Sequence, residues 1–138
     1  MTKKQWVLSH FILALILSLS LTQFFQIKAA QAAITFLDVG QGDSILLQTR
    51  EGKNILIDAG PDGKVVDQLG QKLNFFNQKI DLFILTHPHV DHYGGILDVM
   101  QKYPIGAVML TGVASKDPMY LNFIRNLELK KIPIIYPG

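Results

Sequence analysis

Three of the four histidines in this chain fall within six consecutive positions, together with an aspartate. The stretch LTHPHVDHYGG spans residues 85–95, and its His87, His89, Asp91 and His92 carry side chains of the kind that bind metal ions. A water bound to zinc by such ligands has a pKa of about 7 and supplies hydroxide at neutral pH. The alternative is a solvated loop that is rich in histidine. The density of ligand-type residues directly after an apolar run favours the metal site.

The spacing of these residues predicts two groups of ligands. Alternate side chains of an extended segment leave on the same side, so His87, His89 and Asp91 should point one way. Pro88 favours this conformation because it disfavours helical backbone at the residue before it. His92 follows Asp91 directly and can point towards a neighbouring position. Ligands divided in this way suit two adjacent divalent ions, which together can hold a hydroxide and polarise the bond that it attacks.

The segments before the motif predict β-structure followed by a helix. Three β-rich runs separated by Gly- and Asp-containing turns indicate an antiparallel meander, and they are ITFLDV, SILLQT and NILIDAG. The run VVDQLGQKLNFF has apolar residues at roughly helical spacing, which predicts a helix whose Phe75 and Phe76 belong to the core. The apolar run IDLFILT then predicts a strand buried on both faces that delivers the histidine motif at its carboxyl end.

The segments after the motif alternate between helix and strand. Helices are predicted over ILDVMQKY and over DPMYLNFIRNLELK, the second opened by Asp117 with Pro118 in its first turn. Strands are predicted over IGAVML and IPIIYP. The fold class is therefore α/β, with a hairpin-rich first half that passes into a βαβαβ arrangement.

The first 32 residues have the composition of a targeting segment. Lys3 and Lys4 precede a long apolar stretch over residues 6–25, and Ala30 and Ala32 then fit the small-x-small pattern of a signal-peptidase site. About twenty apolar residues can equally span a bilayer as an uncleaved helix. Both interpretations place the remaining chain outside the cytoplasm, secreted or anchored to the membrane. We therefore divide the chain into residues 1–32, a signal peptide or anchor, and residues 33–138, the folded domain.

Composition excludes some functions and ligands. Of the 13 basic residues, Lys3, Lys4 and Lys28 precede residue 33, which leaves 10 basic against 11 acidic residues in the predicted domain. Such a domain has no net attraction for nucleic acid. Cysteine is absent, so the fold has no disulfide and no metal is held by thiolate.

Around the motif, the sequence resembles the metallo-β-lactamase superfamily, whose signature His-x-His-x-Asp-His is matched by His87, His89, Asp91 and His92. The stretches FLDVGQGDSILLQT and NILIDAG further resemble the extracytoplasmic hydrolase domain of the DNA-uptake competence protein ComEC and its stand-alone relatives. One position differs from that branch, because competence proteins often carry Asp where this chain has His89.

The resemblance implies an αββα sandwich with two divalent ions, zinc or else manganese or iron, at one edge. By this resemblance, His87 and His89 bind the first ion, while Asp91 and His92 bind the second and Asp91 is the candidate catalytic residue. Asp58 of LIDAG would lie beneath the metal loop and hold it by hydrogen bonds, although a turn-forming role before Gly60 is the alternative. Gly40, Gly42 and Asp43 are expected to form a tight hairpin near the site.

No histidine follows His92, whereas the superfamily completes its site with further ligands in the second half of the fold. Asp98, Asp117 and Glu128 fall in or beside predicted helices and are poor replacements. We therefore expect the N-terminal half of the sandwich, in a fragment shortened at its C-terminus.

The function implied is an exported metal-dependent hydrolase that cleaves phosphodiester bonds, with DNA as a possible substrate. Hydrolysis of a lactam, lactone or thioester by the same metals is an alternative, and a non-catalytic remnant is another. The substrate follows from the resemblance alone.

Overall fold

The strands expected from the sequence form one six-stranded sheet in the computed structural model, which describes residues 3–28 and 31–137. The strands lie side by side in chain order, and they are β1 (Ala33–Phe36), β2 (Ile45–Gln48), β3 (Asn54–Ile57), β4 (Leu82–Leu85), β5 (Val108–Leu110) and β6 (Ile134–Ile135). The mixed α/β class is thereby confirmed.

The directions of the strands define two ends of the sheet. The pairs β1–β2 and β2–β3 are antiparallel, whereas β3, β4, β5 and β6 are parallel to one another. Strand β1 therefore runs in the same direction as the four parallel strands. We call the end where these five strands finish the carboxyl end of the sheet, and the end where they start the amino end.

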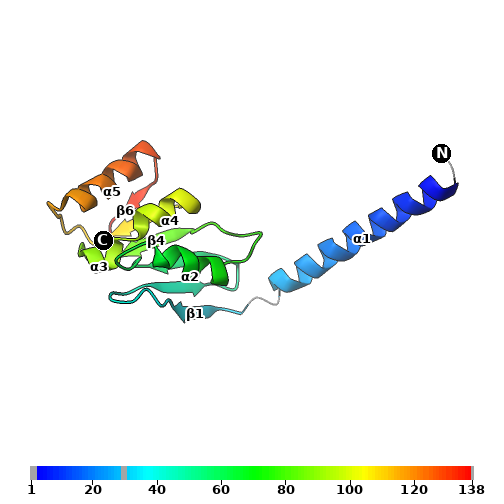
Figure 1. The fold of residues 1–138 in the computed structure, drawn as a ribbon, viewed down its shortest axis with the longest axis horizontal. Coiled ribbons are helices and arrows are strands. Elements are labelled where there is room, and N and C mark those ends of the chain that lie inside the picture. Colours follow the sequence, from blue (N-terminus) through cyan, green and yellow to red (C-terminus); the bar gives the residue numbers. More distant parts are fainter. Residues whose placement is uncertain (1–2, 29–30, 138) are drawn as a thin grey trace.

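Four helices follow β3 in the chain, and the three longer ones cover one face of the sheet (Figure 1). They are α2 (Lys64–Lys72), the short α3 (Val90–Tyr93), α4 (Ile96–Lys102) and α5 (Pro118–Leu129). Val65, Val99 and Phe123 are fully buried against strand residues such as Leu56 and Phe83, in a single apolar core. Parallel connections of this kind are right-handed, which brings successive crossover helices to the same face.

The opposite face of the sheet carries apolar side chains that no helix covers in the described part of the chain (Figure 1). The strand register places ten of them on this open face: Ile34, Phe36, Ile45, Leu47, Ile55, Ile57, Leu82, Ile84, Met109 and Ile135. Phe36 is 78% exposed and Ile34 is 66% exposed. The prediction that the IDLFILT strand is buried on both faces is therefore wrong, because its Leu82 and Ile84 are only partly buried.

Helix α2 ends earlier than predicted. It stops at Lys72, and the Phe75 and Phe76 side chains are 80% and 73% exposed, so the prediction that they belong to the core is wrong. The cause is a turn that starts at Asn74, whose side-chain oxygen accepts a hydrogen bond from the Phe76 amide at 2.9 Å while its carbonyl accepts one from Asn77 N at 2.9 Å. Asparagine stabilises such turns through its side chain and so competes with helix continuation.

The N-terminal segment forms one long helix, α1 (Lys3–Lys28), which projects away from the sheet (Figure 1). Its stretch Lys3–Gln23 has a mean hydropathy of 1.7 and is long and apolar enough to cross a membrane, although a signal sequence meets the same test. Large apolar side chains such as Phe11 and Leu15 are more than half exposed. Ala30 of the predicted cleavage pattern lies outside the described residues.

Candidate metal centre

The histidine motif lies at the carboxyl end of β4, beside the end of β3. The backbone of His89 is extended, with φ −104° and ψ 145°, and α3 then begins at Val90. Asp91 and His92 therefore sit on a helical turn, closed by the hydrogen bond from His92 N to the His89 carbonyl at 2.9 Å. The predicted alternation of side chains through Asp91 is wrong, since the extended conformation ends at His89.

The four motif side chains form one cluster. The His87 ring lies 4.7 Å from the His89 ring and 3.9 Å from the His92 ring, measured between centroids. Nε2 of His92 is 3.8 Å from Oδ2 of Asp91. His92 is buried, whereas the Asp91 side chain is 45% exposed. His87 thus lies beside both ligand pairs that the resemblance implies, because its ring centroid is closer to that of His92 than to that of His89.

Asp58 connects β3, β4 and α3 through one buried carboxylate. Its side chain accepts hydrogen bonds from the Thr86 amide at 2.9 Å and from the Thr86 hydroxyl at 2.6 Å. Its second oxygen also lies 2.8 Å from Nδ1 of His92. Asp58 is 2% exposed and has φ +55°, a left-handed conformation that aspartate tolerates better than most residues. The arrangement directs Nδ1 of His92 to Asp58 and leaves Nε2 on the side of Asp91.

The loop with Gly40 and Gly42 packs directly against the motif. Gly42 has φ +109°, and a Cβ there would overlap the carbonyl oxygen of Asp91. After the loop, the Ser44 hydroxyl donates a hydrogen bond to the Asp58 carbonyl at 3.0 Å. Sequence analysis did not identify Ser44. The only signal for it was its place at the end of the GQGD turn, immediately before a strand.

Asp117, which the sequence analysis judged to be a poor metal ligand, has a structural role. It caps α5 by accepting hydrogen bonds from the Met119 and Tyr120 amides at 2.8 and 3.2 Å. The fully buried Tyr93 also donates its hydroxyl to Oδ1 of Asp117 at 2.9 Å. This bond holds the pKa of Asp117 below its usual value, while burial, followed by the same bond, raises the pKa of Tyr93 to about 12. Asp98 and Glu128 are exposed on α4 and α5.

The donor set fits a divalent metal by chemistry. Three imidazoles and one carboxylate are common ligands of zinc, and a carboxylate that fixes the far nitrogen of a ligand histidine, as Asp58 does at His92, typically accompanies such sites. Within residues 3–28 and 31–137, however, no three His, Cys, Asp or Glu side chains surround a common point as a ready-made site. His87, His89, Asp91 and His92 as metal ligands, and Asp91 as a catalytic residue, therefore stay predictions.

Comparison with known proteins identifies the family. Residues 37–135, which include β2 to β6 and the whole histidine cluster, match the model of the metallo-beta-lactamase superfamily. The chain belongs to this superfamily. The matched region also contains Asp58, Thr86 and the Gly42 loop, so the superfamily assignment and the local geometry concern the same residues.

Several relatives within the superfamily are similar over part of the chain. An exodeoxyribonuclease WalJ of Streptococcus pneumoniae is 36% identical over 45% of this chain and 23% of its own length. The uncharacterized protein YcaI of Escherichia coli is 38% identical over 50% of this chain and 10% of its own length. A hydroxyacylglutathione hydrolase of Pectobacterium carotovorum is 34% identical over 43% of this chain and 22% of its own length. The aligned part of this chain thus spans less than a quarter of each relative.

A solved structure described as a new diphosphatase from the PhnP family matches 70% of this chain and 37% of that chain, with 24% identity and a TM-score of 0.44. The exodeoxyribonuclease and the hydroxyacylglutathione hydrolase belong to other branches than the ComEC-like one suggested by the DVGQGDS stretch, so that finer assignment is not confirmed.

Proposed function

We propose that this chain carries the first ligand group of a metal-dependent hydrolase that acts on phosphodiester bonds. The observation that supports it most directly is the Asp58 network, in which one buried carboxylate fixes Thr86 and His92 at the start and end of the histidine motif. Two of the relatives, the exodeoxyribonuclease and the hydroxyacylglutathione hydrolase, are hydrolases by name.

The chain's own residues have distinct parts in this proposal. His87, His89, Asp91 and His92 would hold two divalent ions, of which zinc is the first candidate. Bound ions of this kind supply hydroxide at neutral pH and stabilise developing negative charge. Asp58 keeps Nδ1 of His92 occupied and thereby presents Nε2 as the ligand atom. The Asp91 carboxylate, whose side chain is 45% exposed, and the exposed His89 are the groups of the cluster that a substrate or water reaches most easily.

DNA is the proposed substrate because two resemblances support it. One is the likeness of DVGQGDS and LIDAG to the ComEC-like hydrolases, and the other is the similarity to an exodeoxyribonuclease. The hydroxyacylglutathione hydrolase favours a thioester as the second candidate. Each candidate needs only a metal-activated water at the same cluster.

Metal content tests the ligand assignment. We expect the full chain in detergent to bind zinc or manganese by mass spectrometry of the metal, and His87→Ala and His89→Ala to lose most of it. His10→Ala is the matched control, since His10 is the fourth histidine of the sequence and lies in α1. Equal metal content in all four proteins would contradict the assignment.

Activity tests the substrate class separately. We expect metal-loaded protein to cleave single- or double-stranded DNA or bis(p-nitrophenyl) phosphate, with loss of activity in EDTA. Hydrolysis of a glutathione thioester without phosphodiester cleavage would instead support the second candidate. Inactivity on all substrates despite bound metal would support the non-catalytic alternative.

We also infer that α1 carries the domain out of the cytoplasm, as a retained anchor or a cleaved signal. Its length and hydropathy support this proposal, and Lys3 and Lys4 at its start suit the cytoplasmic side. An alkaline phosphatase fused after residue 137 should be active in bacterial cells, and Leu15→Lys should lower that activity because a charge at the helix centre opposes insertion. Activity of the fusion only when residues 3–28 are deleted would refute export.

A further inference from the structure

Charge is distributed unevenly between the two ends of the sheet. Of the 10 basic residues after Ala32, seven lie at the amino end of the sheet, with only three of the 11 acidic residues. The basic residues there are Arg50, Lys53, Lys72, Lys79, Lys102, Lys130 and Lys131, and the acidic ones are Glu51, Asp81 and Glu128. The carboxyl end has the other eight acidic residues but only Lys64 and Lys116 among the basic ones, and the tenth basic residue, Arg125, lies within α5. The net charge of the domain is therefore near zero, but its basic and acidic residues are concentrated at opposite ends of the sheet.

Helix chemistry explains only part of the basic end. Lysines in the last turn of α2 and of α4 stabilise the helix dipole, which accounts for Lys72 and Lys102. Arg50 and Lys53 lie in the β2–β3 turn and Lys79 lies in the segment before β4, where no helix ends. Lys53 and Lys79 share one partner, Asp81, at 3.3 and 3.7 Å, so their two charges are balanced by one.

Two exposed phenylalanines stand among these basic residues. Phe75 and Phe76 lie between Lys72 and Lys79, and their rings contact edge to face with centroids 5.2 Å apart. Both side chains are more than 70% exposed. The turn at Asn74 and Asn77 fixes the backbone around them, with the Asn77 side chain donating to the Gly52 carbonyl at 2.6 Å. A hydrogen-bonded turn thus holds two aromatic rings outside the core.

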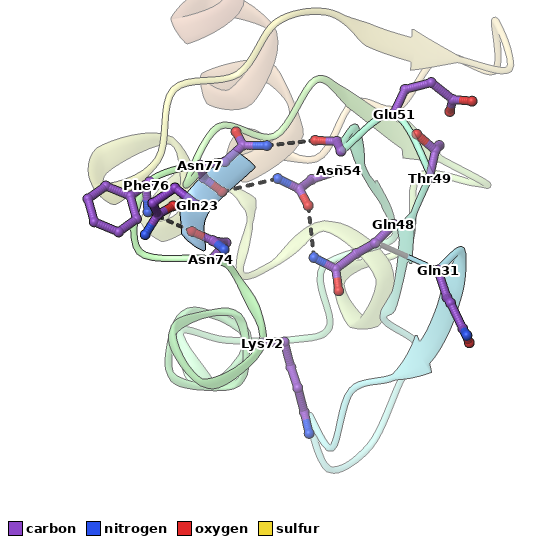
Figure 2. A pocket seen from close by; sticks show the side chains of 11 residues that line it. Gln23, Gln31, Gln48, Thr49, Glu51, Asn54, Lys72, Asn74, Phe76 and Asn77 are labelled. Atoms are coloured by element: carbon purple, nitrogen blue, oxygen red, sulfur yellow. Dashed lines mark hydrogen bonds between the residues drawn. The ribbon is translucent and has the colours of Figure 1, made fainter. Parts of the chain in front are cut away.

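Helix α1 leaves the domain at this same end. Strand β1 starts there at Ala33, only five residue steps after the end of α1 at Lys28, a reach of about 18 Å at most. Gln23 of α1 and Phe76 line one hollow of about 570 Å³, together with Gln48, Asn54 and Lys72 (Figure 2). The histidine cluster and α3 lie at the opposite end of the sheet (Figure 1).

We propose that the amino end of the sheet rests on the surface of an anionic lipid bilayer, with Phe75 and Phe76 inserted at the interface beside a retained α1. Aromatic rings favour the headgroup region, and nearby lysines and arginines are attracted to anionic headgroups. This docking turns the acidic carboxyl end and the His87–His92 cluster away from the membrane, towards the aqueous phase. It depends on α1 remaining attached and is independent of metal binding or hydrolysis.

Single-tryptophan variants test the docking in the full chain. We would synthesise the chain without cells in the presence of vesicles of palmitoyl-oleoyl phosphatidylcholine and phosphatidylglycerol at a ratio of about 3:1. Trp6→Phe removes the single native tryptophan, and Phe76→Trp then reports on the proposed surface. Phe36→Trp is the matched control, because Phe36 is 78% exposed against 73% for Phe76 but lies at the carboxyl end of β1.

We expect the tryptophan at position 76 to be quenched several-fold more strongly by brominated lipids than the one at position 36. Equal quenching at both positions would overturn the proposal. A shift to shorter wavelength at position 76 without quenching by brominated lipid would also overturn it, since protein rather than lipid would then cover the pair.

The contribution of charge to the membrane docking is tested by a separate comparison of lipids and lysine variants. Vesicles of phosphatidylcholine alone, or the double variant Lys72→Gln and Lys102→Gln, should reduce the quenching at position 76. The variant Lys64→Gln and Lys116→Gln, at the carboxyl end, should leave it unchanged. Equal quenching with all lipids and variants would overturn the electrostatic part of the proposal.

Discussion

At the scale of single residues, the Asp58 side chain makes more of the hydrogen bonds that organise the site than the side chain of any proposed ligand does. Its carboxylate accepts from the Thr86 amide and hydroxyl and pairs with Nδ1 of His92, and all three partners lie 28 or more positions away in the sequence. A buried carboxylate is stable only when such partners replace water. The same contacts therefore stabilise the fold and orient His92.

Asp58→Asn should weaken both properties. The amide keeps the size of the side chain but loses the charge and one acceptor oxygen, so we expect the free energy of unfolding to fall by about 2–3 kcal/mol. Metal affinity should fall on the order of tenfold or more, as it does when the partner of a ligand histidine is removed. Urea unfolding and zinc titration measure the two effects.

Asp67→Asn is the control for this substitution, because Asp67 is exposed on the surface of α2. It should change neither quantity. If Asp58→Asn and Asp67→Asn had the same unfolding midpoint and the same zinc affinity, Asp58 would not have the role assigned to it.

Tyr93 makes the free energy of unfolding depend on pH in the alkaline range. Its folded pKa of about 12 is higher than its ordinary value of 10.0, so folding favours the protonated phenol. The resulting stabilisation is fully present below pH 10 and is lost as the pH rises towards about 12. A shift of about two pKa units corresponds to about 3 kcal/mol.

Tyr93→Phe isolates this effect. Below pH 9 it should cost about 1 kcal/mol through the lost hydrogen bond to Asp117. Between pH 10 and pH 12 its unfolding free energy should fall less steeply than that of the natural chain, as measured by urea unfolding at several pH values. Parallel pH profiles would show that Tyr93 titrates as an ordinary tyrosine.

Sequence analysis found the proposed ligands and Asp58 because these residue types are unusual at such spacing. It assigned no contact to Ser44, whose hydroxyl bonds to the Asp58 carbonyl, since a single serine after a turn has no distinctive pattern. The positions of the four motif side chains were only partly foreseeable. An extended segment and a helical turn orient Asp91 differently, and the start of α3 at Val90 decides between them.

At the scale of elements, loops packed against the motif determine its position. Gly42→Ala should be strongly destabilising because the new methyl group overlaps the Asp91 carbonyl and the residue has positive φ. Gly52→Ala is a matched control, since Gly52 also has positive φ, at +77°, but the Cβ built there lies no closer than 3.9 Å to the Asn77 side chain.

We expect Gly52→Ala to cost about 1–2 kcal/mol from backbone strain alone. Gly42→Ala should cost more than that and should also displace Asp91, reducing metal affinity. Thermal unfolding and zinc titration of both variants test this. Equal costs and unchanged zinc affinity would indicate that the GQGD loop can move away from Asp91 freely.

Local sequence patterns predict the boundaries of helices and strands only where the deciding contacts are themselves local. The N-terminal cap of α5 was predicted correctly because Asp117 and Pro118 act within one helical turn. The end of α2 was predicted wrongly because apolar periodicity continues to Phe76, whereas the Asn74 turn interrupts the backbone first. A buried asparagine, Asn54, also holds this turn by donating to the carbonyls of Asn77 and Lys79 at 3.3 and 2.8 Å, a contact that the sequence does not reveal.

At the scale of the whole molecule, the open face of the sheet is the main departure from an ordinary soluble domain. The register aligns its apolar side chains in two rows, from Phe36 to Ile135 and from Ile34 to Leu82. Strand patterns predicted that these side chains are apolar, but a pattern does not say what packs on them. Exposed apolar patches beyond a few hundred Å² mark surfaces that associate with another surface.

Protein produced without residues 1–32 should therefore self-associate through this face. Phe36→Lys places a charge on the edge strand, where its side chain is 78% exposed, so it should weaken association without unfolding the domain. Losing the burial of one phenylalanine, about 2 kcal/mol, corresponds to a dissociation constant roughly 30-fold higher in sedimentation equilibrium. Leu121→Lys is the control, because Leu121 is 52% exposed on α5, across the sheet from this face. Association that is equally weakened by both variants, or by neither, would show that some other surface joins the copies.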